Sequence, residues 1–151
     1  VVETFSELCS YAEDHDAYVG IEGAAGHVLY DVKTLKTACD EINKDNLKII
    51  FDIYNFLDES NSTDYLNILD AGIDTFGQKI HCFHIKDCYI RQNEKPVQCP
   101  VGKGDLDFIE IFTRIKRHNE NALLILEGTT GSDIDYAVDF INKQWNMVKK
   151  I

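Results

Sequence analysis

The sequence predicts an α/β fold in which four strand–helix units follow one another and the strands run parallel. Short β-branched runs alternate four times with polar loops and segments of helical period, and no linker interrupts them. The strand segments are near-continuous apolar runs such as KIIF and LLIL, typical of a parallel sheet covered on both faces. Successive strands are roughly 30 to 40 residues apart, enough for a right-handed crossover that contains a helix.

The first two units occupy the N-terminal part of the chain. We expect a helix over residues 4–14, opened by a capping box of Thr4 and Glu7, before a strand over residues 17–23. We expect Asp31 to cap a second helix, which precedes a strand over residues 47–55. The apolar positions expected to be buried are Phe5, Leu8, Cys9 and Ala12 in the first helix and Val32, Leu35, Cys39 and Ile42 in the second.

The last two units follow the same pattern. A third helix should begin at Thr63 or Asp64 and end at Gly77, before a strand over residues 79–87. A long loop over residues 88–107 leads to an amphipathic helix and a strand over residues 122–128. The final helix should begin at Ser132, with Asp135 as a capping partner. Its expected buried positions are Ile134, Val138, Ile141 and Trp145.

Composition bounds the kind of protein. A chain of 151 residues suggests one domain, residues 1–151, and is shorter than the roughly 250 residues of a complete eight-fold βα barrel. With 15 basic and 26 acidic residues the formal charge is −11, which disfavours nucleic acid as a partner. No apolar run approaches the roughly 20 residues of a membrane span, and no signal peptide is recognisable. We therefore expect a cytoplasmic protein with no membrane partner.

Two further features concern the ends and the cysteines. The chain begins with Val1 rather than an initiator Met, so we expect a fragment of a longer chain. The five cysteines form no Cys-x-x-Cys pair, and their odd number favours reduced thiols over a disulfide framework.

Each predicted strand ends in a potential metal ligand. These are Glu22 in VGIEG, Asp52 in FDIYN, His84 in FHIKD and Glu127 in LILEG. Because parallel strands present their carboxyl ends at one rim, the four side chains should converge there. Three carboxylates and an imidazole favour Mn²⁺, Mg²⁺ or Co²⁺, with Zn²⁺ also compatible. The alternative is that each residue separately caps a helix or satisfies a loop N–H group.

The motifs VGIEG, FDIYN, FHIKD, PVGKGDLDF and LILEG, in this order, resemble the C-terminal half of the xylose isomerase-like TIM barrels. This is the sugar isomerase and epimerase superfamily that also contains endonuclease IV. The resemblance implies that the chain is the C-terminal (βα)4 portion of a (β/α)8 barrel. It also implies that Glu22, Asp52, His84 and Glu127 hold one divalent cation.

The same resemblance implies a metal-dependent isomerase or epimerase that acts on a sugar, sugar phosphate or polyol through an enediolate. Glu22 and Glu127 would be the catalytic acid/base pair, as in the family, while Asp52 and His84 mainly hold the metal. Strand alternation places Lys86 on the side of His84, where it could bind substrate or pair with a carboxylate. Asn55 and Arg91 are the other candidate substrate-binding residues, against the alternatives of a turn residue and a solvated surface cation.

Other functions stay open. An inosose-type dehydratase would use the same enolate chemistry. An endonuclease IV-like enzyme is disfavoured, because Asn55, Pro96 and Gln98 stand where that family has further zinc ligands. A non-catalytic fragment or binding domain is the third alternative. For the half barrel, we expect a second copy or an absent N-terminal half to cover the open side, because its edge strands would otherwise be unpaired.

Overall fold

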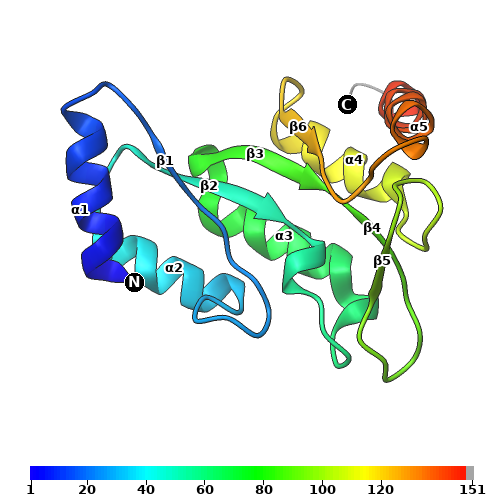
Figure 1. Cartoon of the computed structure of the whole chain (residues 1–151), viewed down its shortest axis with the longest axis horizontal. Coiled ribbons are helices and arrows are strands. Elements are labelled where there is room, and N and C mark those ends of the chain that lie inside the picture. Colours follow the sequence, from blue (N-terminus) through cyan, green and yellow to red (C-terminus); the bar gives the residue numbers. More distant parts are fainter. Residues whose placement is uncertain (149–151) are drawn as a thin grey trace.

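The computed structural model describes residues 1–148 and confirms the parallel α/β architecture. Four strands form one sheet in the order β1-β2-β3-β6, and every neighbouring pair is parallel. The strands are β1 (Val19–Ile21), β2 (Leu47–Asp52), β3 (Ile80–Ile85) and β6 (Leu123–Leu126). Because each strand pairs with the next one of the sheet along the chain, every connection crosses in the same sense (Figure 1).

Within residues 1–148, five α-helices line the sheet in chain order, from α1 at one end to α5 at the other (Figure 1). They are α1 (Val2–Glu13), α2 (Val32–Ile42), α3 (Tyr65–Phe76), α4 (Phe108–His118) and α5 (Asp133–Met147). Each contacts the next helix in the row. Short 3₁₀ turns occupy Tyr54–Phe56, Ser62–Asp64 and Gly77–Lys79. A four-stranded parallel sheet with one row of helices is half of a βα barrel.

The core lies between the sheet and the helices. Phe51 of β2 is fully buried, and its ring contacts those of Phe56, Phe76 and Phe83 at centroid distances of 5.4, 6.5 and 6.2 Å. Helix α3 approaches this ring closely because it carries Gly72, where a Cβ atom would lie 2.1 Å from Phe51 Cζ. Since side chains alternate along a strand, burial of Phe51 against the helices turns Asp52 toward the opposite, inner face.

The helix ends agree only in part with the sequence patterns. Asp31 caps α2 as predicted: its carboxylate accepts a 2.7 Å hydrogen bond from the Thr34 N–H. Gly77 ends α3 with a φ of 50°, a conformation that favours glycine. The capping box of Thr4 and Glu7 is wrong, because α1 begins at Val2 and Thr4 already lies in the first turn. Neither the N-cap of α3 nor that of α5 makes a side-chain capping hydrogen bond.

Three predicted core positions are instead exposed. Leu8 in α1 is 48% exposed, and Ile134 and Val138 in α5 are 43% and 42% exposed. The reason is position in the row: α1 and α5 are its two ends, so each has a neighbouring helix on one side. An apolar stripe that would face two neighbours is therefore half uncovered.

The sheet is not covered on both faces. Leu124 and Leu126 of β6 pack against the core, whereas Leu123 and Ile125 on the alternate side are 50% and 39% exposed. Helices cover the first side only, so the inner face, on which Asp52 also lies, stays open. The prediction that both faces are covered, which rested on the apolar strand segments, is therefore wrong for this chain. Such segments suit a complete barrel, in which the inner face is buried as well.

The expected long loop contains a two-stranded antiparallel ribbon. β4 (Asp87–Tyr89) pairs with β5 (Val97–Cys99), and Asp87 lies opposite Cys99. The buried Asp87 carboxylate accepts hydrogen bonds from four backbone N–H groups, those of Cys88 (2.8 Å), Gly102 (2.9 Å), Gly104 (2.9 Å) and Leu106 (3.4 Å). This carboxylate thus organises the whole return segment to α4.

Two other sequence features are visible in the fold. All five cysteines are unpaired and buried, which agrees with the prediction of reduced thiols. Within residues 1–148, no helix combines the length and the apolar character needed to cross a bilayer.

Candidate metal centre

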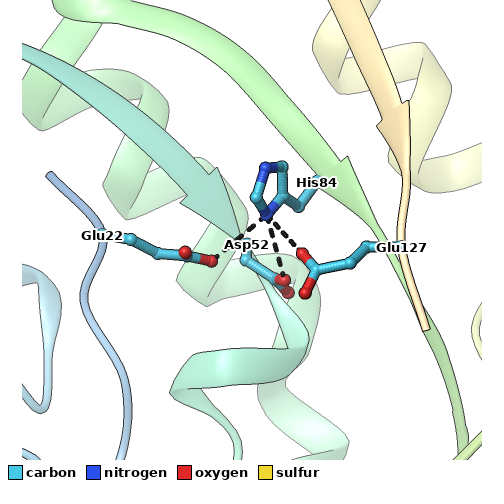
Figure 2. A group of neighbouring side chains, drawn as sticks. All are labelled: Glu22, Asp52, His84 and Glu127. Carbon is cyan, nitrogen blue, oxygen red and sulfur yellow. Dashed lines mark ion pairs between the residues drawn. The ribbon is translucent and has the colours of Figure 1, made fainter. Parts of the chain in front are cut away.

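The four predicted ligands converge at the carboxyl ends of the strands. Glu22 directly follows β1, Asp52 is the last residue of β2, His84 lies near the end of β3, and Glu127 directly follows β6. The register of the sheet aligns them, because Asp52 lies opposite His84. Figure 2 shows the four side chains pointing toward one another from these four elements. Convergence was the central prediction from the sequence, and the geometry agrees with it.

The imidazole of His84 stands among the three carboxylates. Its Nδ1 atom lies 2.5 Å from Glu127 Oε2, 3.3 Å from Glu22 Oε1 and 3.9 Å from Asp52 Oδ2 (Figure 2). One ligand atom from each of the four residues can be chosen such that all lie within 4.8 Å of one another. Divalent cations hold nitrogen and oxygen ligands at about 2.0–2.2 Å, so ligands on opposite sides of an ion are about 4.2 Å apart. The cluster therefore needs a contraction of only about half an ångström to fit one ion.

Three buried atoms of this cluster, Asp52 Oδ2, His84 Nδ1 and Glu127 Oε2, make no regular hydrogen bond within the described part of the chain. Their contacts are ion pairs, with one another, with Lys86 for Asp52 Oδ2 and with Glu22 for His84 Nδ1. Leaving buried polar atoms without hydrogen bonds is costly, so native proteins rarely do so without a reason. All three belong to predicted ligands, and all three face the same point. The donor set and these three atoms without regular hydrogen bonds together fit a divalent cation.

Asn55 and Lys86, both predicted to bind substrate, are also brought into the cluster. The Asn55 amide donates to Glu22 Oε1 at 2.8 Å, and its Oδ1 accepts from Lys86 Nζ at 3.0 Å. Lys86 Nζ lies 2.9 Å from Asp52 Oδ2 and 3.2 Å from Glu127 Oε1. The alternative role of Lys86, pairing with a carboxylate, is thus realised in this structure with two of the predicted ligands, Asp52 and Glu127.

Burial and these contacts shift two pKa values in the cluster. Burial raises the pKa of Asp52 above its usual value, although Lys86 and the Asn55 N–H favour the ionised form and oppose the shift. Burial alone would lower the pKa of Lys86, but its contacts with Asp52 and Glu127 outweigh burial and raise it. Lys86 therefore stays charged beside the carboxylates.

Arg91 is not part of the cluster. It lies in the loop between β4 and β5, where its side chain is 73% exposed and its nearest acidic partner is Glu94 at 3.9 Å. Lys103, in the same region of the chain, pairs with Asp133 at the start of α5. Substrate binding by Arg91 stays a prediction, because no contact links its side chain to the cluster among the described residues.

Two further residues lie near the cluster: Tyr54, which the sequence analysis did not single out, and Gln98, which it considered only as a departure from the endonuclease IV ligands. The Tyr54 ring lies 5.8 Å from Lys86 Nζ, and its hydroxyl donates to the Pro96 carbonyl at 3.5 Å, which ties the ribbon to the end of β2. Gln98 of β5 lies against Gly128, where a Cβ atom would meet its amide at 1.6 Å. The position of Tyr54, two residues after Asp52, could have indicated that its side chain lies near the predicted site. The approach of Gln98 depends on the unpredicted ribbon.

Fold and site together define a class: a (βα)4 half barrel with a candidate metal centre at the carboxyl ends of its strands. The family model described as xylose isomerase-like TIM barrel matches residues 1–144. The chain therefore belongs to the xylose isomerase-like TIM barrel family, as its motifs indicated. Comparison with curated proteins gave no match.

Solved structures of this family share the fold. A xylose isomerase domain protein from Planctomyces limnophilus is 18% identical with a TM-score of 0.78, and the match covers 97% of this chain and 51% of that one. An IolI protein, whose structure holds a zinc atom, is 17% identical with a TM-score of 0.73, covering 99% and 56%. A D-tagatose 3-epimerase-like protein is 22% identical with a TM-score of 0.72, covering 97% and 54%. The chain thus spans about half the length of these structures and is a partial barrel.

Proposed function

We propose that this half barrel carries the metal and acid/base site of a sugar isomerase or epimerase that moves a proton next to a carbonyl group. The carrying observation is the convergence of Glu22, Asp52, His84 and Glu127, whose ligand atoms lie within 4.8 Å of one another. Structures similar in fold include proteins described as D-tagatose 3-epimerase-like, D-psicose 3-epimerase and L-ribulose 3-epimerase. A ketose is therefore the substrate class that we propose.

The four residues would hold one divalent cation, and the three carboxylates favour Mn²⁺, Mg²⁺ or Co²⁺ over a sulfur-preferring ion. The zinc atom in the IolI structure shows that Zn²⁺ is compatible with a member of this fold. When bound, such a cation polarises the substrate carbonyl and stabilises the negative charge that develops as the neighbouring proton leaves.

In this proposal Glu22 and Glu127 are the acid and the base, one on each side of the substrate. They come from the two outer strands of the sheet and approach the cluster from opposite sides (Figure 2). Both side chains are partly exposed, at 30% and 44%, whereas that of Asp52 is 1% exposed. Reaching a substrate proton requires an accessible carboxylate, so these two fit proton transfer, and Asp52 and His84 fit holding the ion.

Asn55 and Lys86 offer polar groups for substrate oxygens beside Glu22 and Glu127. A hollow of about 300 Å³ opens beside Asn55, and its lining includes Glu22, His27, Phe5 of α1 and apolar residues of the loop between β1 and α2. Arg91 would join them only if the loop between β4 and β5 brings it toward the substrate, and a phosphorylated sugar would favour that movement.

Exchange of substrate hydrogen with solvent tests this proposal whichever product forms. The chain, loaded with Mn²⁺, is incubated in D₂O with D-tagatose, D-psicose or L-ribulose. Proton NMR follows loss of the C1–H signals, which isomerisation would exchange, and of the C3–H signal, which epimerisation would exchange. We expect exchange with at least one ketose and its loss in Glu22→Gln and Glu127→Gln, while Glu94→Gln in the exposed loop serves as the matched control. If the chain binds Mn²⁺ but catalyses no exchange, a metal-binding fragment is favoured. If it releases water from a cyclic polyol, a dehydratase is favoured.

We also propose that a complementary half barrel covers the open inner face. Leu123 and Ile125 are exposed there, β1 and β6 each have an unpaired edge, and the similar structures are about twice as long. Four further parallel strands would pair both edges and bury these apolar side chains. Analytical ultracentrifugation and activity assays together identify the source of these strands. A concentration-dependent dimer that Ile125→Lys weakens indicates a second copy of the chain. A monomer that gains activity when an N-terminal half is added indicates a separate segment. A monomer that neither associates nor responds would contradict the proposal.

A further inference from the structure

Lys86 enters the cluster of ligands from the end of β3, two residues beyond His84. Its side chain is 9% exposed, and its ammonium contacts Asp52 Oδ2 at 2.9 Å, Glu127 Oε1 at 3.2 Å and Asn55 Oδ1 at 3.0 Å. Two of these three contacts are with predicted metal ligands. The lysine therefore shares its partners with the cation that the site is suited to hold.

The charge balance gives this contact its meaning. Three carboxylates, of which that of Asp52 is buried, converge on one point, and their mutual repulsion would destabilise the metal-free fold. Among the ion pairs of residues 1–148, Lys86 is the only lysine or arginine paired with these carboxylates. A buried charge pair is tolerated when its partners are close and hydrogen-bonded, and the Asn55 contact supplies one such bond. Lys86 thus supplies one positive charge inside the site before any metal arrives.

We propose that Lys86 is the internal counter-ion of the metal-free site and that it limits the affinity for divalent cations. This inference rests on the proposed metal centre. To bind Asp52 and Glu127, a cation must displace Lys86 from these carboxylates. The negative charge that attracts the cation is also smaller by one unit, because Lys86 is positively charged. The lysine keeps the protein folded without metal and makes metal binding weaker and more readily reversible than the carboxylates alone would allow.

Replacing Lys86 should therefore change stability and metal affinity in opposite directions, which replacement of a merely structural lysine would not do. In Lys86→Met the metal-free chain should melt at a lower temperature, because the carboxylates lose their counter-ion. The same variant should bind Mn²⁺ about tenfold more tightly or better, because the competing charge is gone. Saturating Mn²⁺ should then restore most of the lost melting temperature. A lysine that only supports the fold would weaken both stability and binding.

The experiment measures Mn²⁺ affinity by isothermal titration calorimetry and melting temperature in chelator for the wild type, Lys86→Met and Lys86→Gln. Lys48→Met is the matched control, since Lys48 lies four residues before Asp52 on β2, roughly 13 Å from the cluster, and packs over Tyr18. Lys86→Gln keeps a polar group near Asn55 in case the methionine variant does not fold, and recovery of folding by Mn²⁺ would itself support the proposal.

The outcomes distinguish this inference from the proposed function. If the wild type binds Mn²⁺ and both Lys86 variants bind with equal or lower affinity, the counter-ion role is overturned and the metal centre stands. If none of these proteins binds Mn²⁺, the metal centre is refuted and the role of Lys86 with it. Tighter binding by the two variants and unchanged binding by Lys48→Met is the result we expect.

Discussion

The side-chain amide of Asn55 joins two opposite parts of the candidate site: it donates to Glu22 Oε1 at 2.8 Å and accepts from Lys86 Nζ at 3.0 Å. Its backbone N–H also donates to Asp52 Oδ1 at 3.2 Å. Three of its polar atoms thus orient groups that surround the cluster. Residues that position metal ligands in this way affect metal affinity nearly as strongly as the ligands themselves.

Removing this amide should weaken metal binding. We expect Asn55→Ala to lower Mn²⁺ affinity by about tenfold, because Glu22 loses its orienting donor, whereas Asp52 keeps its contacts with the backbone N–H of residue 55 and with Lys86. Isothermal titration calorimetry measures the change, and Asn67→Ala, at an exposed position of α3, is the control. Equal affinities for the two variants would show that the amide does not position the ligands.

Metal affinity should depend on pH through Asp52. Its pKa is raised by burial, so a proton competes for this carboxylate at higher pH than for an ordinary aspartate. Affinity should be complete above the raised pKa and should be lost as the pH falls through it, with protons released on binding. Titrations with Mn²⁺ between pH 8 and pH 4.5 in buffers of different ionisation enthalpy measure both quantities. Affinity that does not change over this range would contradict the assignment of Asp52 as a ligand.

Asp87 should be important for stability rather than for binding. In Asp87→Asn one carboxylate oxygen becomes an NH₂ group that faces backbone N–H donors, so at least one accepted hydrogen bond is lost in a buried site. We expect a loss of about 3 kcal/mol in the free energy of unfolding. Urea denaturation measures it, and hydrogen exchange should show faster exchange at Gly102 and Gly104.

The control for this prediction is Asp105→Asn in the same segment. Asp105 is exposed and accepts a single hydrogen bond, from the Ile90 N–H at 2.8 Å, so its replacement should cost less than about 1 kcal/mol. Similar losses for the two variants would mean that the four-fold contact of Asp87 has no special role.

Gly72 should resist the substitution that usually stabilises helices. Alanine in a helix interior is favoured over glycine by about 1 kcal/mol. In α3, however, the new methyl group would lie 2.1 Å from Phe51 Cζ, and the fully buried ring has little space to move. We expect Gly72→Ala to destabilise the protein by about 1–3 kcal/mol.

A double-mutant cycle with Phe51→Leu checks this cause. The smaller leucine leaves space for the methyl group, so the two substitutions together should cost clearly less than the sum of their separate costs. Additive costs would place the origin of the effect elsewhere in α3.

The sequence predicted the four strands of the main sheet, their direction and the convergence of the four side chains at one rim, because each follows from a local pattern along the chain. Asp52 and His84 end apolar strands, and in a parallel sheet those ends meet at one rim. Lys86 could be placed beside His84 for the same reason, since alternation along a strand fixes its side. None of these inferences depends on the conformation of the loops.

The parts that failed depend on what surrounds an element. The apolar pattern of Leu8, Ile134 and Val138 indicates a buried helix face, but whether a neighbour covers that face depends on place in the row. The position of Arg91 could not be derived because it lies in the loop between two short antiparallel strands, β4 and β5. No period in the sequence signals such a ribbon.

Along the segment from His84 to Asp87, successive side chains alternate between the two faces of the chain, so that the two basic residues and the acidic residue lie on opposite faces. His84 and Lys86 face the cluster, while Asp87 points away and holds the return segment in place through four backbone amides. A slip of one residue here would reverse every side. It would bring a fourth carboxylate into the site, remove Lys86 from it and leave the return segment without its acceptor. The insertion or deletion of a single codon between these residues would therefore be more damaging than any single substitution among them.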